Sequence, residues 1–327
     1  SLIPGRQARG YPAPMPVSLP RRAFAVSSVL GVMGLLGCGA NAHGREVEDY
    51  FDGFPIVQDA SADRTGDSAN GYRTDVQLTL VDDAELEQIL DMLAQARTAY
   101  TRRGASVFPT LVWSASGTAV TLNLPDLGDK NEDPEREEEM VRLAAGLAGG
   151  SAQSVSGSQT QIEIDRGDGD DLPDDLVVSC PSSPSGTVYV VKDHVGLPGW
   201  SVTVGTASGE DLSAVLLGKV ISRMIVRGTA SDPYSLTLES ESASESDLVT
   251  LTVHLPQSVS GSEKDAAAAV LRAVVDTPVL EYVDIYGVED GTRFSYTVKD
   301  GVPGVDAEAS SSAREARDIL KRAGVGS

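Results

Sequence analysis

Residues 76–90, VQLTLVDDAELEQIL, contain the pattern from which a fold class can be argued. Apolar and polar side chains alternate over the first five residues, which is typical of a strand with one buried face. Leu86, Ile89 and Leu90 then follow at the spacing of an amphipathic helix. Asp82, followed by an acid three residues later, stands where the N-cap of that helix is expected. The stretch therefore predicts a strand followed directly by a helix.

A similar stretch occurs further along the chain at residues 202–216, VTVGTASGEDLSAVL. The strand, the N-cap position and the apolar helix positions correspond at a single offset, at which Leu86 matches Leu212. If the two stretches are copies, Leu86 and Leu212 occupy equivalent buried places on two helices. The match predicts an internal repeat.

Further segments continue each copy in the same order. These are the strands 120–125 and 249–253, a second helix in each unit, capped by Asp133-Pro134 in the first and by Ser260 with Glu263 in the second, and the strands 162–164 and 283–285. Each unit thus reads strand, helix, strand, strand, helix, strand, and residues 296–304 resemble 189–199. This order predicts an α+β protein of duplicated ferredoxin-like (split βαβ) units with a partial third repeat. The alternative is one α/β domain with coincidental similarity.

The N-terminal residues read as an export leader. Arg21 and Arg22 precede an apolar run over residues 23–37, which is too short for a stable membrane span and is typical of a signal peptide. The pair, followed by Ala23-Phe24, resembles the core of twin-arginine leaders. The flanking residues depart from that pattern, so the general secretory route stays open.

The apolar run ends in Leu35, Leu36, Gly37 and Cys38, which resemble the lipobox of exported bacterial lipoproteins. The resemblance implies cleavage before Cys38 and a lipid on its thiol. It also implies that the protein is held by that lipid on the extracytoplasmic face of the cell membrane.

Composition and the leader together suggest the domain organisation. We expect a leader over 1–37, a lipidated cysteine with a flexible stalk over 38–53, a first α/β unit with an acidic linker over 54–186, and a second unit with a C-terminal helix over 187–327. The stalk is inferred from its small and polar residues.

The charge of the chain argues against nucleic-acid binding. The formal net charge is −22. Residues 1–37 hold four arginines and no acid, which leaves 22 basic and 48 acidic side chains, or −26, in the remainder. Such a body is repelled by phosphate backbones.

The sequence shows few candidates for chemistry. The acidic stretch 165–175 lacks the alternate-position register of an EF-hand loop and is interpreted as a solvated linker, with a weak Ca²⁺ site as the alternative. The acid-rich run Glu132–Glu139 is explained by the dipole at a helix start. Cys180 ends an apolar run and is expected to be a small buried hydrophobe. No cofactor or metal motif is present, so none is expected.

These observations favour a non-catalytic binding or interaction module of the cell envelope, whose partner is an envelope protein or a small ligand. The alternative is an extracytoplasmic hydrolase in which His194 or His254 meets an acid and a nucleophile that are distant in sequence. His254 is expected on the Thr250 and Thr252 face of its strand, away from the core. A transporter's substrate-binding lipoprotein is a third reading, although the long alternating βα segments of two hinged lobes are missing.

Overall fold

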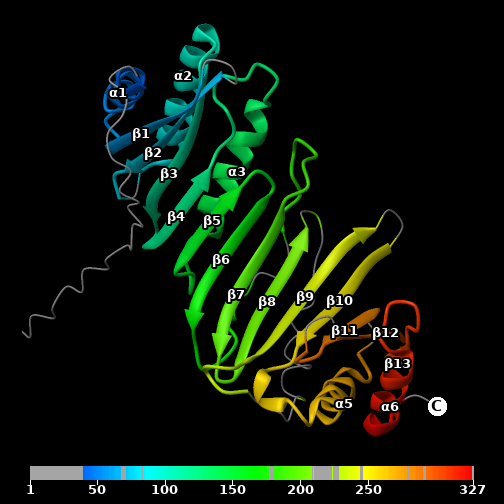
Figure 1. The fold of residues 1–327 in the computed structure, drawn as a ribbon. Coiled ribbons are helices and arrows are strands. Elements are labelled where there is room, and N and C mark those ends of the chain that lie inside the picture. Colours follow the sequence, from blue (N-terminus) through cyan, green and yellow to red (C-terminus); the bar gives the residue numbers. More distant parts are fainter. Residues whose placement is uncertain are drawn as a thin grey trace, which may run out of the picture. The chain divides into compact units, whose positions relative to one another are not determined.

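The computed structural model describes residues 40–67, 71–82, 84–174, 176, 180–207, 209, 223, 228–243, 246–277, 280–289 and 292–325. Within them, one mixed sheet of thirteen strands holds every strand beside its neighbours in chain order (Figure 1). The strands are β1 (Val57–Asp67), β2 (Gly71–Leu80), β3 (Ser106–Ala115), β4 (Thr118–Asn123), β5 (Ser154–Ser158), β6 (Gln161–Asp168), β7 (Val190–Leu197), β8 (Trp200–Ala207), β9 (Tyr234–Ala243), β10 (Ser246–His254), β11 (Tyr282–Tyr286), β12 (Arg293–Lys299) and β13 (Val302–Val305). The helices are α1 (Ala40–Phe51), α2 (Leu86–Arg103), α3 (Pro134–Leu147), α5 (Glu263–Val274) and α6 (Ala313–Ala323), with a short 3₁₀ turn, η1 (Gln257–Val259).

The sheet is built from hairpins joined side by side. Antiparallel pairs such as β1–β2, β3–β4 and β5–β6 alternate with parallel pairs such as β2–β3 and β4–β5. The helices α2, α3 and α5 supply the crossovers that parallel neighbours require. The same alternation continues through β7–β8, β9–β10 and β11–β12.

This topology shows that the predicted duplicated ferredoxin-like fold is wrong. A split βαβ unit leaves room for a further strand between the two strands that flank a helix. Here β2 and β3, on either side of α2, pair directly, as do β4 and β5 around α3. The expected match of 162–164 with 283–285 also fails, because β11 follows its helix directly whereas β6 comes one strand later. Leu86 is only partly buried, and Leu212 lies outside the described residues.

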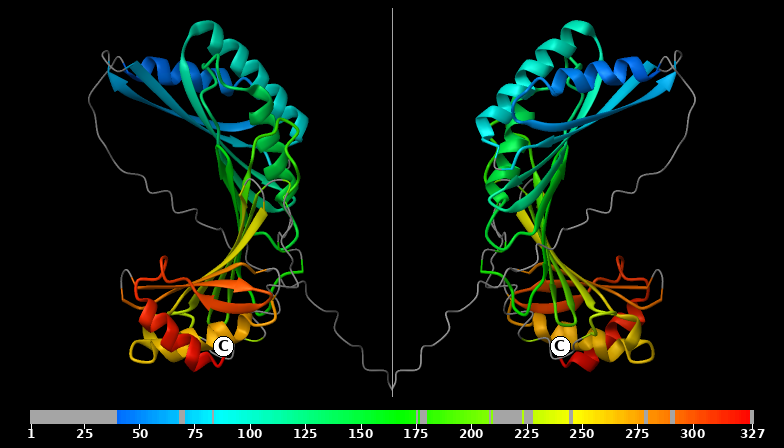
Figure 2. Two further views of the ribbon diagram at one scale, coloured as in Figure 1. Left: turned by 90° about the vertical axis from the view of Figure 1, so that its right-hand side faces the viewer. Right: turned by 90° about the vertical axis from the view of Figure 1, so that its left-hand side faces the viewer.

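One face of the sheet carries buried side chains on every strand from β2 to β13, whereas the described side chains of the outer strand β1 are partly buried or exposed. Residues that pair across neighbouring strands are buried together on this face, for example Leu111 with Leu122 and Leu238 with Leu251. The helices pack on this face (Figure 2). The apolar side chains form two clusters, one running from α1 to β7 and the other centred on β8–β12, α5 and α6. Among the described residues, no helix is both long and apolar enough to cross a membrane.

The predicted flexible stalk is largely a helix. Residues 40–51 form α1, and Val47 and Phe51 are buried in the first cluster. The Phe51 ring lies 6.0 Å from the ring of Tyr100, centroid to centroid. Glu48 accepts a hydrogen bond of 2.8 Å from the backbone N–H of Ala62 in the outer strand β1. The segment is polar on average, but its apolar residues recur at helical spacing, so it folds onto the body.

A buried ion pair lies where the two clusters meet. Arg166 of β6 and Asp193 of β7 face the covered side of the sheet and are 7% and 0% exposed. Arg166 Nε and a terminal nitrogen each lie 2.7 Å from a carboxylate oxygen of Asp193. Arg166 also donates to Ser151 Oγ at 2.5 Å. Arg166 is therefore a buried residue of strand β6, whereas the sequence predicted that it lies in the solvated linker 165–175.

Candidate functional site

The residues that the leader singles out cannot be placed in the structure. Arg21, Arg22, Leu35, Leu36, Gly37 and Cys38 all lie outside the described residues. Lipidation of Cys38 therefore stays a prediction.

The second cysteine is placed and behaves as predicted. Cys180 is 3% exposed and belongs to the first hydrophobic cluster. Burial raises the pKa of its thiol to about 11. The side chain is therefore uncharged at neutral pH and acts as a small hydrophobe.

His254 lies on the open face of the sheet, as predicted. Val253 beside it in the strand is buried, whereas the His254 ring is exposed and stacks on Tyr286 with ring centroids 4.5 Å apart. The described residues form cavities of about 560, 440 and 730 Å³, and His254 lines none of these three. The structure therefore gives this histidine a surface position, with Ser235 as its register neighbour on β9 and no hydrogen bond between the two side chains among the described residues.

His194, unlike His254, lines a cavity and has polar neighbours. It lies in strand β7, and its Nδ1 is 2.8 Å from Thr203 Oγ1. Asp165 is its register neighbour on β6, and both line the cavity of about 730 Å³. In the residues that the structure describes, no carboxylate hydrogen-bonds to the His194 ring. The hydrolase alternative requires an acid and a nucleophile joined through the histidine, and among the described residues only the Thr203 hydroxyl is hydrogen-bonded to the ring.

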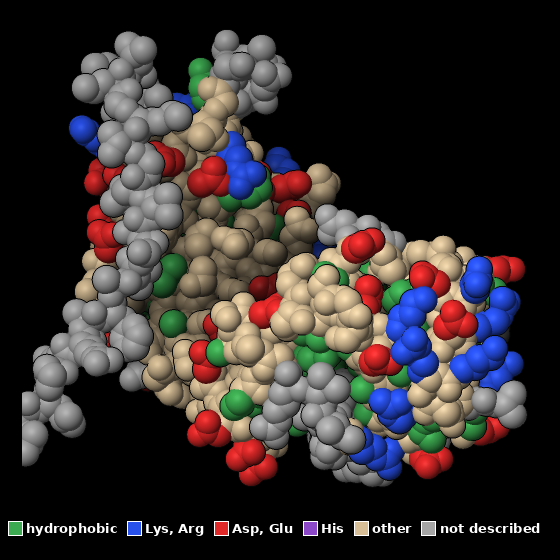
Figure 3. Space-filling model, turned by 60° about the horizontal axis from the view of Figure 1, so that its bottom comes forward, with side chains coloured by type: hydrophobic (Ala, Val, Ile, Leu, Met, Phe, Trp, Pro, Cys, Tyr) green, Lys and Arg blue, Asp and Glu red, His purple; other side chains and the backbone are tan. Residues whose placement is uncertain are grey.

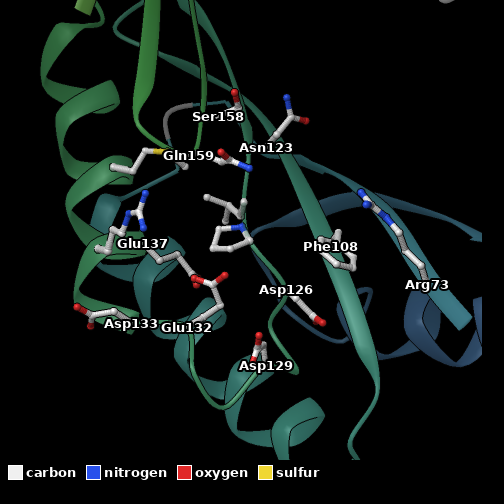
Figure 4. Close-up of a pocket in the computed structure, with 14 residues that line it drawn as sticks. Arg73, Phe108, Asn123, Asp126, Asp129, Glu132, Asp133, Glu137, Ser158 and Gln159 are labelled. Atoms are coloured by element: carbon white, nitrogen blue, oxygen red, sulfur yellow. The ribbon is translucent and has the colours of Figure 1, made fainter. Parts of the chain in front are cut away.

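The cavity of about 560 Å³ lies at the carboxyl ends of the parallel strands β4 and β5 (Figure 4). Asn123 and Ser158, the last residues of these strands, line it together with Phe108 and the start of α3. The carboxyl ends of parallel strands are where open α/β sheets bind their ligands. Gly128 shapes the adjoining loop, because a Cβ there would come within 2.0 Å of the Ala105 carbonyl oxygen.

The lining of this cavity is rich in carboxylates, and most of them have structural partners. Asp126 accepts hydrogen bonds of 2.8 Å from the backbone N–H groups of Val107 and Gly128. Asp133 caps α3 by accepting from the Glu135 N–H at 3.0 Å, as the Asp133-Pro134 motif predicts. Asp129 accepts from Asn131, and Glu137 pairs with Arg97. Glu132 also lines the cavity, and no hydrogen bond or ion pair engages it within the described residues.

The helix dipole, which explains most of the acid-rich run Glu132–Glu139, does not account for Glu137. The helix dipole explains Glu135 in the first turn of α3, but Glu137 points inward and is 4% exposed. Burial raises the pKa of its carboxyl against the opposing effect of Arg97, and the charge of Glu132 raises it further. Its position three and four residues before Met140 and Val141 is the sequence signal that identifies it as part of the buried stripe.

The arrangement suits a positively charged ligand. Five carboxylates line the cavity, against Arg73 and Arg136. Arg73 is already paired with Asp75 and stacked on the Phe108 ring at 3.9 Å. Figure 4 shows Glu132 and Glu137 extending into the same part of the cavity. A cationic group placed there would relieve the repulsion between these two carboxylates.

The chain matches no protein-family model, no curated protein and no solved structure.

Proposed function

We propose that this protein is a lipid-anchored module of the cell envelope that binds a ligand without transforming it. The lipobox at Cys38 supports the anchor. The cavity between β4, β5 and α3 supports the ligand site, and it is the observation that carries the proposal. Among the described residues no carboxylate hydrogen-bonds to the His194 ring, which favours binding over hydrolysis.

The ligand carries an ammonium or guanidinium group beside a small apolar part. Glu132 is the carboxylate that is free to pair with the cation, whereas Glu137 is already paired with Arg97. Phe108, Leu124 and Met140 provide apolar contact at the same cavity. Small-molecule sites commonly combine an apolar lining with a few charged groups in this way.

Replacing Glu132 by glutamine is expected to weaken binding of a cationic probe such as spermidine or a lysine tripeptide. A lost charge-assisted hydrogen bond is worth about 1.5–3 kcal/mol, or roughly a 10- to 100-fold change in Kd. Isothermal titration calorimetry on the full chain measures the effect.

Glu135→Gln is the matched control, because it removes the same charge three residues further along, in the first turn of α3, at a position that does not line the cavity. We expect its Kd to stay within about twofold of wild type. Equal losses in the two variants would mean that net charge, and not the cavity, governs binding. That result would refute the assignment of the site.

Cys38→Ser is expected to abolish lipid attachment and leave the chain in the soluble fraction or as uncleaved precursor. Membrane fractionation with immunodetection measures this, and Cys180→Ser serves as the thiol control. A processed Cys38→Ser protein that sediments with membranes as strongly as wild type would show that another feature holds it there.

A further inference from the structure

A basic stripe on α6 stands out from the acidic chain. Arg314, Arg317 and Lys321 recur at helical spacing on its exposed side. None of the three has a hydrogen bond or ion pair within the residues that the structure describes. Two nearby cations are neutralised instead, since Lys264 pairs with Glu315 and Arg322 pairs with Asp265. Figure 3 shows Lys and Arg side chains gathered on the part of the surface formed by α5 and α6.

A groove adjoins this stripe at the edge of the sheet. Its volume is about 440 Å³, and it lies where the last strand, β13, passes α6. Lys299 and Arg317 line it and are both exposed. Val302, which is 48% exposed, lines it with Pro303 and Leu320. The groove thus joins an apolar floor to two cations that have no carboxylate partner among the described residues.

The backbone at this edge is unsuited to pairing with another strand. Hydrogen-bonded and non-bonded pairs alternate along an antiparallel ladder. Because Asp306 donates its N–H to Ser295 O, the backbone groups of Gly304 face β12 and those of Pro303 face outward. Proline lacks an N–H, so the outer edge offers few donors to a further strand. Recognition at this groove therefore depends on side chains.

A bilayer does not fit this surface. The apolar side of α6 is already used, because Ala316, Ile319 and Ala323 are buried in the core and the Tyr296 hydroxyl donates to the Ala316 carbonyl. A membrane-surface helix needs that side free for insertion. A polyanion without apolar groups would leave the exposed Val302 side chain uncovered.

We infer that the groove between β13 and α6 binds an acidic polypeptide segment, with carboxylates on Lys299 and Arg317 and apolar side chains on the floor between them. This site is separate from the carboxylate-lined cavity and independent of the proposed anchor. The chain as a whole has a net charge of −22 and repels acidic segments, so the attraction comes only from the cationic stripe and the two cations of the groove.

A fluorescent peptide of alternating glutamate and valine, measured by anisotropy with the full chain, tests the inference. The double variant Lys299→Gln with Arg317→Gln is expected to weaken binding roughly tenfold or more. The control Arg102→Gln with Arg103→Gln removes the same charge at the exposed end of α2 and is expected to bind as wild type does. Circular dichroism verifies that both variants are folded.

Three results would overturn the inference. The first is unchanged affinity in the groove variant. The second is an equal loss in the control, which would indicate attraction by overall charge. The third is groove-dependent binding of inorganic polyphosphate without binding of the glutamate–valine peptide, which would show that the partner is another class of polyanion.

Discussion

Replacing Asp193 by alanine is expected to lower the free energy of unfolding by about 3–5 kcal/mol, because the buried Arg166 guanidinium then loses both of its hydrogen bonds to the Asp193 carboxylate. Chemical denaturation followed by circular dichroism measures the loss. The pair lies between the two hydrophobic clusters. The same variant therefore also tests whether the clusters unfold together, since a separated transition would appear as two steps.

Two comparisons make this result specific. Asp193→Leu combined with Arg166→Met removes both charges of the pair and is expected to recover most of the stability, because neither partner is then buried without the other. Glu87→Ala breaks the exposed pair with Arg142 and is expected to cost less than about 1 kcal/mol. If Asp193→Ala costs no more than Glu87→Ala, the pair is not buried as described.

Phe51→Ala is expected to cost about 3–5 kcal/mol, the range for truncating a fully buried aromatic ring. Phe51 is 0% exposed and packs within the aromatic group of Tyr50, Phe54 and Tyr100. The variant measures how firmly α1 is part of the body, again by denaturant unfolding.

Asp52→Ala is the neighbouring control, because Asp52 is exposed and its loss is expected to change stability by no more than about 0.5 kcal/mol. A flexible stalk would make both substitutions equally harmless. Equal and small effects would therefore contradict the docking of α1.

Local patterns predicted many elements because their signals lie within a few residues. Alternation located β2, β4 and β10, and Asp133-Pro134 marked the start of α3. The expected C-terminal helix is α6, in which Ser312 accepts a hydrogen bond from the Glu315 N–H at the start and Gly324 ends the helix at a φ of 67°. Strand pairing was predicted wrongly, because alternation shows which face of a strand is buried and says nothing about its neighbours.

The candidate site was harder to predict than the elements that carry it. Glu137 sits on the buried stripe of its helix, and Asp193 and Arg166 sit at buried positions of their strands beside Val191 and Ile164. The sequence shows that these charged residues fall at positions where the alternation or helical spacing predicts burial, and a buried charge requires a partner. Which partner it meets depends on the sheet register, and that follows only from the complete fold.

The helix α1 also bears on how far the protein can reach. With a lipid on Cys38, as we propose, Ala40 begins a docked helix only two residues from the anchor. Two residues span at most about 7 Å, whereas a flexible stalk of fifteen would range over roughly 20 Å. The body would then stay beside the membrane surface and be unable to search the envelope for its ligand. Its partners would have to diffuse to the membrane, or be membrane-bound themselves.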